Sequence, residues 1–300
     1  MLFTRFPAFG DDRISIPSFA FDPTDPWTRT FQIGLARADL RGKCVYEVGV
    51  GSGANVAFML RDCAASMVIG SDLDPRLPVL AQQLVAQVVP DLADRFRPIL
   101  GSVSLLDLPA AVAAVATANV VVGCLPQVPD PHDDRYIRFR RAQLRSVSSG
   151  GQQVADHLAH YYPWASFDNY PFNCVGLGLI EALLRRVRTH APHAQVVLNL
   201  GCRVGKEVLF RLFRANGYRP EELASSIVRQ SDRTEISFFV ALEAAMQDTG
   251  HEARCEFYAD PAGQEPISAA AAQEILSGDP AKPVFHEICV LRGYPEHSGR

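Results

Sequence analysis

The stretch Glu47-Val48-Gly49-Val50-Gly51-Ser52-Gly53 decides the fold of this chain. It follows a short apolar run, Cys44–Val48, that predicts a buried strand, and it opens a predicted helix over Gly53–Asp62. Glycines in such a turn permit positive φ angles and let a ligand approach the backbone closely. The helix N-terminus that follows offers N–H groups and a partial positive charge, so the turn favours an anionic ligand group, a carboxylate or a pyrophosphate.

Predicted strands and helices alternate outward from this turn. The predicted strands are Cys44–Val48, Met67–Ser71, Arg97–Leu100, Asn119–Gly123, Gln195–Leu200 and Glu235–Glu243. The predicted helices are Gly53–Asp62, Pro78–Val89, Ala110–Ala116, Gly178–Arg188 and Lys206–Ala215. This alternation predicts an α/β fold with a doubly wound, mostly parallel sheet that helices cover on both faces.

Three segments lie outside or interrupt the alternating pattern. Residues 1–40 are rich in proline and predict an irregular N-terminal arm before a main domain at 41–245. Residues 150–175 are rich in aromatic side chains and predict a substrate-binding insertion. Residues 246–300 predict a small C-terminal addition, with elements at Arg254–Ala259, Ala269–Leu276 and Val284–Leu291.

Composition narrows the class of partner and the compartment. The 300 residues carry a net charge of −4 and no basic block, which favours a small molecule over nucleic acid or an anionic membrane. Seven cysteines without a C-x-x-C pair indicate a reducing compartment, so we expect a cytoplasmic protein without a zinc site. His157 and His160 have the spacing of metal ligands, but no third ligand accompanies them and we expect no metal.

The glycine turn fits two classes of nucleoside cofactor. Gly49, Gly51 and Ala54 also satisfy the dinucleotide pattern, which keeps a nicotinamide oxidoreductase open as an alternative. Asp72 ends the second strand, where an acidic residue accepts ribose hydroxyls in either class. Glu47 favours S-adenosylmethionine, because dinucleotide enzymes usually have an apolar residue there whereas the methyltransferase pattern has Asp or Glu.

The turn after the fourth strand, Gly123-Cys124-Leu125-Pro126-Gln127, bears on the methyl acceptor. Many amino-methylating enzymes carry Asn-Pro-Pro-Tyr at this place, and Cys124 here replaces the Asn that accepts a hydrogen bond from the substrate nitrogen. A thioether sulfur has no proton to lose, so it needs in-line placement and tolerance of positive charge rather than a general base. Aromatic faces supply that tolerance, and the candidates are Tyr161, Tyr162, Trp164, Phe167, Tyr170 and Phe172.

A set of longer matches runs along nearly the whole chain. It comprises Ile16-Pro17-Ser18, Trp27, Phe31–Leu35, the Glu47 loop, Gly123–Gln127, Gly176–Ile180, Asn199–Gly205, Arg211–Phe213, Asp232–Ser237 and Phe257. On these stretches the chain resembles the methyltransferase domain of the methionine S-methyltransferases, where Gly123–Gln127 reads Gly-Cys-Ile-Pro-Gln and Asn199–Gly205 reads Asn-Met-Gly-Gly-Arg-Pro-Gly. The plant members carry a further aminotransferase-like domain, so this chain looks like the stand-alone bacterial form associated with dimethylsulfoniopropionate synthesis.

The resemblance implies a Rossmann-like class I methyltransferase with a seven-stranded sheet. It implies methyl transfer from S-adenosylmethionine to the thioether of L-methionine, giving S-methylmethionine and S-adenosylhomocysteine, without a general base and in a homodimer. The cofactor-binding residues would be Glu47, Gly49, Gly51, Gly53, Asp72, Ser102, Val103, Cys124 and Leu125.

The carboxylate and the ammonium group of the amino acid substrate also need partners in the protein. Arg203, in the glycine-rich turn that opens the helix at Lys206, would bind the carboxylate, with the free N–H groups of that helix N-terminus beside it. Asp168 and Asn169 would bind the ammonium group, and the remaining substrate-binding candidates are Tyr161, Trp164 and Tyr170. Alternative functions are methylation of oxygen or nitrogen in another small molecule or in a protein glutamine, and non-catalytic binding of S-adenosylmethionine.

Overall fold

The computed structural model describes residues 25–74, 76–101, 105–127, 170–230, 236–246, 254–278 and 282–296. Their strands form one nine-stranded sheet in the order β3-β2-β1-β4-β5-β9-β7-β8, and β6 pairs with β9. Five strands are parallel: β1 (Cys44–Val48), β2 (Met67–Asp72), β3 (Phe96–Leu100), β4 (Val120–Gly123) and β5 (Gln195–Gly201). The antiparallel strands are β6 (Tyr218–Arg229), β7 (Phe257–Tyr258), β8 (Pro266–Ile267) and β9 (Phe285–Pro295).

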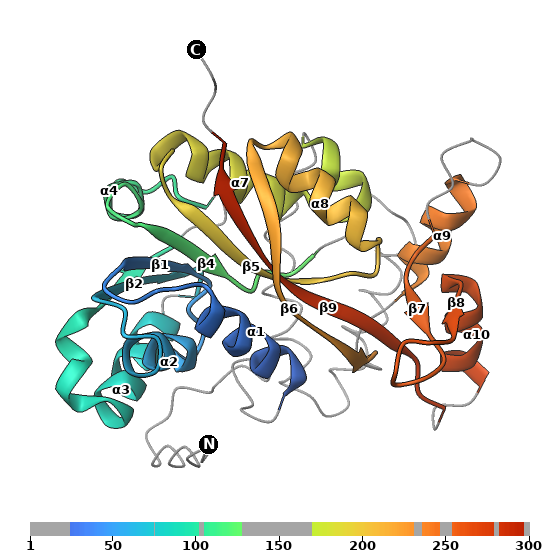
Figure 1. Ribbon diagram of the computed structural model, residues 1–300, viewed down its shortest axis with the longest axis horizontal. Helices are drawn as coiled ribbons and strands as arrows, with labels where there is room; N and C mark the ends of the chain where they lie inside the picture. The colour runs from blue at the N-terminus through green and yellow to red at the C-terminus, as the bar shows by residue number, and fades with distance from the viewer. Residues whose placement is uncertain are drawn as a thin grey trace.

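Helices cover both faces of this sheet (Figure 1). One face holds α1 (Pro26–Arg37), α2 (Ala54–Arg61) and α3 (Arg76–Val88), the last followed by the short helix η1 (Pro90–Arg95). The other face holds α4 (Pro109–Val115), α7 (Gly178–His190) and α8 (Lys206–Ala215), with the short helix η3 (Pro171–Val175) before α7. Two apolar clusters, one on each side of the sheet, form the core.

A smaller unit gathers at one end of β9. Helices α9 (Ser237–Met246) and α10 (Ala269–Gly278) pack there with β7 and β8 around a separate apolar cluster. None of the described helices is long and apolar enough to cross a membrane.

The strand order confirms the predicted class I methyltransferase fold. Parallel strands run 3-2-1-4-5, and an antiparallel strand, β9, lies between β5 and β6. Within the described residues the sheet has nine strands rather than the expected seven, because the short β7–β8 hairpin extends it beyond β9.

The structure differs from the sequence predictions in the last third of the chain. The predicted strand Glu235–Glu243 is wrong, since α9 occupies Ser237–Met246. A short apolar run such as Phe238–Leu242 has no periodicity that separates a strand from a helix, and here it packs against α10. The strand β6 was not predicted, because Glu221, Glu222, Ser225 and Ser226 hide its apolar pattern.

Two boundaries of the predicted domain organisation also change. Val284–Leu291 does not belong to a peripheral addition, because β9 pairs with β5 and β6 inside the main sheet. The irregular arm expected over 1–40 contains α1, which begins at Pro26. Asp25 caps this helix by accepting from Thr28 N at 3.0 Å, and Phe31 and Leu35 bury its apolar side against the sheet.

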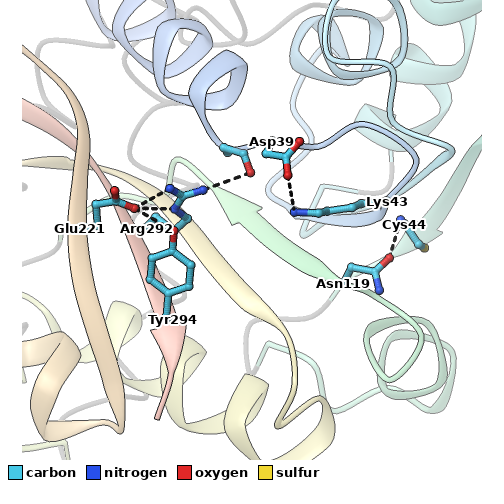
Figure 2. Close-up of polar contacts among 8 residues, drawn as sticks. Asp39, Lys43, Cys44, Asn119, Glu221, Arg292 and Tyr294 are labelled. Carbon is cyan, nitrogen blue, oxygen red and sulfur yellow. Dashed lines mark hydrogen bonds and ion pairs between the residues drawn. The ribbon is translucent and has the colours of Figure 1, made fainter.

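Polar contacts tie β6 and β9 together at the edge of the sheet where β1 begins (Figure 2). Arg292 donates from Nε and Nη2 to Glu221 Oε2 at 2.8 and 2.5 Å, and Tyr294 Oη donates to the same oxygen at 3.0 Å. Nearby, Cys44 N donates to Asn119 Oδ1 at 2.9 Å, which ties the start of β1 to the start of β4. The guanidinium beside Glu221 holds the pKa of that carboxyl below its usual value.

Arg292→Ala is expected to destabilise the protein by about 1 kcal/mol, since it removes a two-pronged ion pair and the packing of the arginine stem. Because the pKa of Glu221 is lower in the folded protein than in the unfolded chain, the ion pair stabilises the protein above the unfolded pKa of this carboxyl. That stabilisation is lost in acid, as Glu221 takes up a proton. Urea unfolding at pH 7 and pH 3 measures both effects. The control is Arg219→Ala, whose exposed guanidinium also lies 4.7 Å from the Tyr294 ring centroid. An equal loss in the two variants would contradict the expectation.

Candidate functional site

The glycine turn after β1 folds onto β2 and α3. Gly49, Gly51 and Gly53 have φ angles of +76°, +53° and +84°. Gly49 N and Val50 N both donate to Ser71 O, at 2.8 and 3.0 Å. A Cβ on Gly53 would meet Ala81 Cα at 2.7 Å, so this glycine allows α2 to start directly against α3. The predicted glycines thus serve both the turn and the helix packing.

Asp72 and Gly51 face one another across the ends of β1 and β2. Asp72 is 7% exposed, and its Oδ2 accepts from Gly51 N at 2.9 Å while Oδ1 accepts from Asp74 N at 3.1 Å. A Cβ on Gly51 would have no described atom within 4 Å, so the turn is open on that side. A carboxylate fixed beside an open backbone turn is suited to accept hydroxyl groups of a ligand.

Glu47 is the buried acidic residue beneath this turn. It is 1% exposed, and Oε1 accepts only a long bond of 3.4 Å from Asn55 Nδ2. Its Oε2 has no hydrogen-bond partner within the described ranges. Burial, with a smaller contribution from Asp72, raises the pKa of Glu47 to about 8. A cationic ligand group such as an ammonium would pair with the unsatisfied oxygen and favour the ionised form of this carboxyl.

The raised pKa of Glu47 predicts an unusual pH dependence of stability. The folded protein keeps a proton that the unfolded chain releases, so stability falls as the pH rises from 4.5 to 8. Glu47→Gln is expected to abolish this fall, which amounts to roughly 4 kcal/mol between pH 5 and pH 8.5. Urea unfolding of the ligand-free protein at pH 5 and pH 8.5 measures it, with exposed Glu207→Gln as the control. An unchanged pH slope in Glu47→Gln would show that another group titrates.

The turn after β4 lies against the glycine turn. Leu125 Cδ2 lies 3.1 Å from where a Cβ of Gly49 would be, so the two turns touch. Cys124 Sγ accepts from Asn199 Nδ2 at 3.5 Å. Although Cys124 is exposed to solvent, the protein around it, together with Asp25 and Glu47, raises the pKa of its thiol above the usual value. At neutral pH this position therefore holds an uncharged thiol rather than a base.

Two residues connect the turn after β4 to the end of β5. Gln127 Nε2 donates to Gly201 O at 2.9 Å, and Gly201 N donates to Gln127 Oε1 at 2.7 Å. Asn199 is fully buried and its Nδ2 also donates to Trp27 O at 3.1 Å, while Oδ1 has no partner among the described residues. Gln127 thus joins the turn after β4 to the end of β5 through two hydrogen bonds, and Asn199 links Cys124 to the start of α1.

Arg203 lies in the turn after β5, as the sequence predicts. Its Nε donates to Gln230 Oε1 at 2.8 Å, and its Cζ lies 6.0 Å from the centroid of the Trp27 ring. The predicted anion site at the start of α8 needs correction, because Lys206 N donates to Glu256 Oε1 at 3.2 Å. A carboxylate of the protein already caps that helix, so Arg203 is the anion-binding candidate and the helix N-terminus is not.

Of the other predicted substrate residues, only Tyr170 lies in the described part of the chain. Tyr161, Trp164, Asp168 and Asn169, and the cofactor candidates Ser102 and Val103, lie outside the described residues. Tyr170 lies against Arg185, whose Cζ is 5.1 Å from the ring centroid. Arg185 belongs to α7, and α7 covers the face of the sheet opposite to the α1 that carries Trp27 (Figure 1).

Sequence reasoning missed His286. It lies on β9, is 1% exposed, and neither ring nitrogen has a hydrogen-bond partner in the part of the chain that the structure describes. Its ring centroid is 6.0 Å from that of Trp27. A single histidine in an apolar strand carries no signal in the sequence, and only the insertion of β9 beside β5 brings it to this edge.

The comparisons with known proteins add a relationship in sequence. No family model matches the chain. The methionine S-methyltransferase of Zea mays is 28% identical over 272 residues, covering 86% of this chain and 24% of the relative. The methionine S-methyltransferase of Arabidopsis thaliana is 27% identical with the same coverage. The chain thus spans about a quarter of the length of these curated relatives.

Solved structures are more distant. The YcgJ protein from Bacillus subtilis has a TM-score of 0.46 at 12% identity, with 90% of this chain and 99% of that chain covered. A SAM-dependent methyltransferase from Geobacter sulfurreducens, solved in complex with S-adenosyl-L-homocysteine, has a TM-score of 0.42 at 15% identity, with 92% and 93% covered. The fold class accordingly rests on the strand order. The chain has a class I methyltransferase fold and is related in sequence to the methionine S-methyltransferases.

Proposed function

We propose that this protein is a methyltransferase that uses S-adenosylmethionine to methylate the thioether sulfur of L-methionine, giving S-methylmethionine and S-adenosylhomocysteine. The relationship to methionine S-methyltransferases supports the substrate. The resemblance also supports a cytoplasmic homodimer and a place as the first step of dimethylsulfoniopropionate synthesis. The observation that carries the proposal is the buried, incompletely paired Glu47 beneath an open glycine turn that faces Asp72.

The residues of the glycine turn fit the cofactor. Asp72 would accept the ribose hydroxyls, and the open side of Gly51 would let the cofactor lie against the backbone. Glu47 Oε2 would receive the ammonium group, which satisfies a buried oxygen that is otherwise unpaired. Gly49, Gly53, Cys124 and Leu125 would complete the described part of the site. When bound, S-adenosylmethionine supplies a methyl group on a positively charged sulfur.

The end of β4 supports an acceptor without a proton to lose. Methylation of a thioether releases no proton, so the protein needs no base at this place. Cys124 occupies the position and its high pKa keeps it uncharged. The protein must instead hold the amino acid in a fixed orientation. The two hydrogen bonds between Gln127 and Gly201 support this, because they hold the end of β4 in place relative to β5 and Arg203.

One observation favours the alternative acceptor class. Asn199 Oδ1 is buried beside Cys124 and has no partner within the described ranges, and an amide oxygen is the kind of acceptor that holds a substrate N–H. Methylation of an amino or amide nitrogen is therefore the second candidate. A substrate panel that contains methionine, its sulfur-free analogue norleucine and free glutamine separates the two candidates, because only methionine offers a thioether.

Arg203→Ala is expected to raise the Michaelis constant for methionine about 10-fold, since a charge-assisted pair with the carboxylate is lost. Its affinity for S-adenosylmethionine is expected to stay within about 3-fold. Steady-state kinetics with each substrate varied in turn measure both, and exposed Arg211→Ala on α8 is the matched control. Equal effects on the two substrates would remove Arg203 from the carboxylate role.

A further inference from the structure

His286 is a buried polar side chain with no hydrogen-bond partner for either ring nitrogen among the described residues. It is 1% exposed, yet Nδ1 and Nε2 both lack a hydrogen-bond partner in the described residues. The imidazole carries one N–H donor and one acceptor when neutral, and burying both unpaired is costly. Such a group in a folded protein calls for an explanation, and a bound ligand is one.

The surroundings of His286 indicate which ligand. His286 pairs in register with Val228 of β6, and its ring lies 6.0 Å from Trp27 of α1. The charged group that acts on the imidazole is Arg203, whose Cζ lies 6.0 Å from the centroid of the same Trp27 ring. One indole therefore has an arginine and a histidine beside it, both with N–H donors.

The position of Arg203 is fixed before any ligand arrives. Gln230 holds Nε at 2.8 Å, and a Cβ on Gly201 would meet Arg203 Nη1 at 3.2 Å, so this glycine lets the guanidinium lie against the end of β5. A guanidinium and an imidazole that share one aromatic neighbour form a pair of donors, which matches the two oxygens of a carboxylate.

We propose that His286 is a second ligand of the substrate's carboxylate, donating an imidazole N–H to the group that Arg203 binds. This inference rests on the proposed function and adds a specificity residue to it. Burial and Arg203 hold the pKa of His286 well below its usual range, so the imidazole is neutral at physiological pH. A neutral donor adds a hydrogen bond without adding a second positive charge beside a substrate whose sulfur becomes cationic.

The test compares methionine with 3-(methylthio)propylamine, which keeps the thioether and the amine but lacks the carboxylate. His286→Leu is expected to lower kcat/KM for methionine about 10-fold and to leave kcat/KM for the amine unchanged. A purely structural defect would lower both equally, and that result would overturn the proposal. His286→Gln, which keeps an N–H donor, is expected to recover most of the activity with methionine. The control is His193→Leu, an exposed histidine before β5.

Calorimetric titration of L-methionine into protein saturated with S-adenosylhomocysteine separates this inference from the proposed function. Wild type that binds methionine about 10-fold more tightly than His286→Leu supports the carboxylate role even where no methyl transfer occurs. Equal methionine affinity in the two proteins overturns it, even where S-methylmethionine forms. An unchanged affinity for S-adenosylhomocysteine shows that His286→Leu keeps its fold.

Discussion

Asp72→Ala is expected to weaken the binding of S-adenosylmethionine about 200-fold. The carboxylate is 7% exposed at the end of β2, already oriented by Gly51 N at 2.9 Å. Two charge-assisted hydrogen bonds to ribose hydroxyls are each worth about 1.5 kcal/mol or more, and the variant loses both. Calorimetric titration of the cofactor into the purified protein measures the change.

The matched control for Asp72→Ala is Asp62→Ala. Asp62 ends α2 and forms an exposed ion pair with Arg61 at 2.8 Å, so its loss should leave cofactor affinity unchanged. Asp72→Asn separates charge from shape and should fall between wild type and Asp72→Ala. If Asp72→Ala binds S-adenosylmethionine as tightly as Asp62→Ala does, the end of β2 is not part of the cofactor site.

Gly51→Ala is expected to weaken cofactor binding about 100-fold while costing only about 1 kcal/mol of stability. The stability cost comes from the φ angle of +53°, which disfavours a side chain. The added Cβ meets no described atom within 4 Å, so it points into the space where the cofactor would lie. Thermal unfolding and calorimetric titration measure the two effects separately.

Gly42→Ala is the control that isolates strain from binding. Gly42 has a φ angle of +69° and its Cβ would also meet no described atom, but it lies before β1, at the opposite edge of the sheet. Both variants should lose similar stability, and only Gly51→Ala should lose cofactor affinity. Equal affinity in the two variants would place the cofactor elsewhere.

The sequence predicted the first half of the sheet well because each element there carries a local signal. The buried strands β1, β2 and β4 are continuous apolar runs between helices, and the glycine turn marks the start of α2. Asp72 and Glu47 were placed correctly beside that turn because the ends of neighbouring parallel strands meet at one edge.

The rest of the site depends on pairing that local sequence does not encode. His286 reaches the edge only because β9 inserts between β5 and β6, and nothing in residues 284–291 distinguishes a central strand from a peripheral one. Trp27 reaches Arg203 because α1 packs across β6 and β9. The free helix N-terminus expected at Lys206 is capped by Glu256, which is 50 residues away in the chain.

The most direct test of methyl transfer to the thioether is to incubate the protein with S-adenosylmethionine bearing a deuterated methyl group and with unlabelled L-methionine. Methylation of the thioether gives a product with the mass of trideuterated S-methylmethionine, whose fragments carry the label on sulfur, and no product with norleucine. Label on nitrogen or oxygen, or no transfer to methionine while the cofactor still binds, would contradict methylation of the thioether.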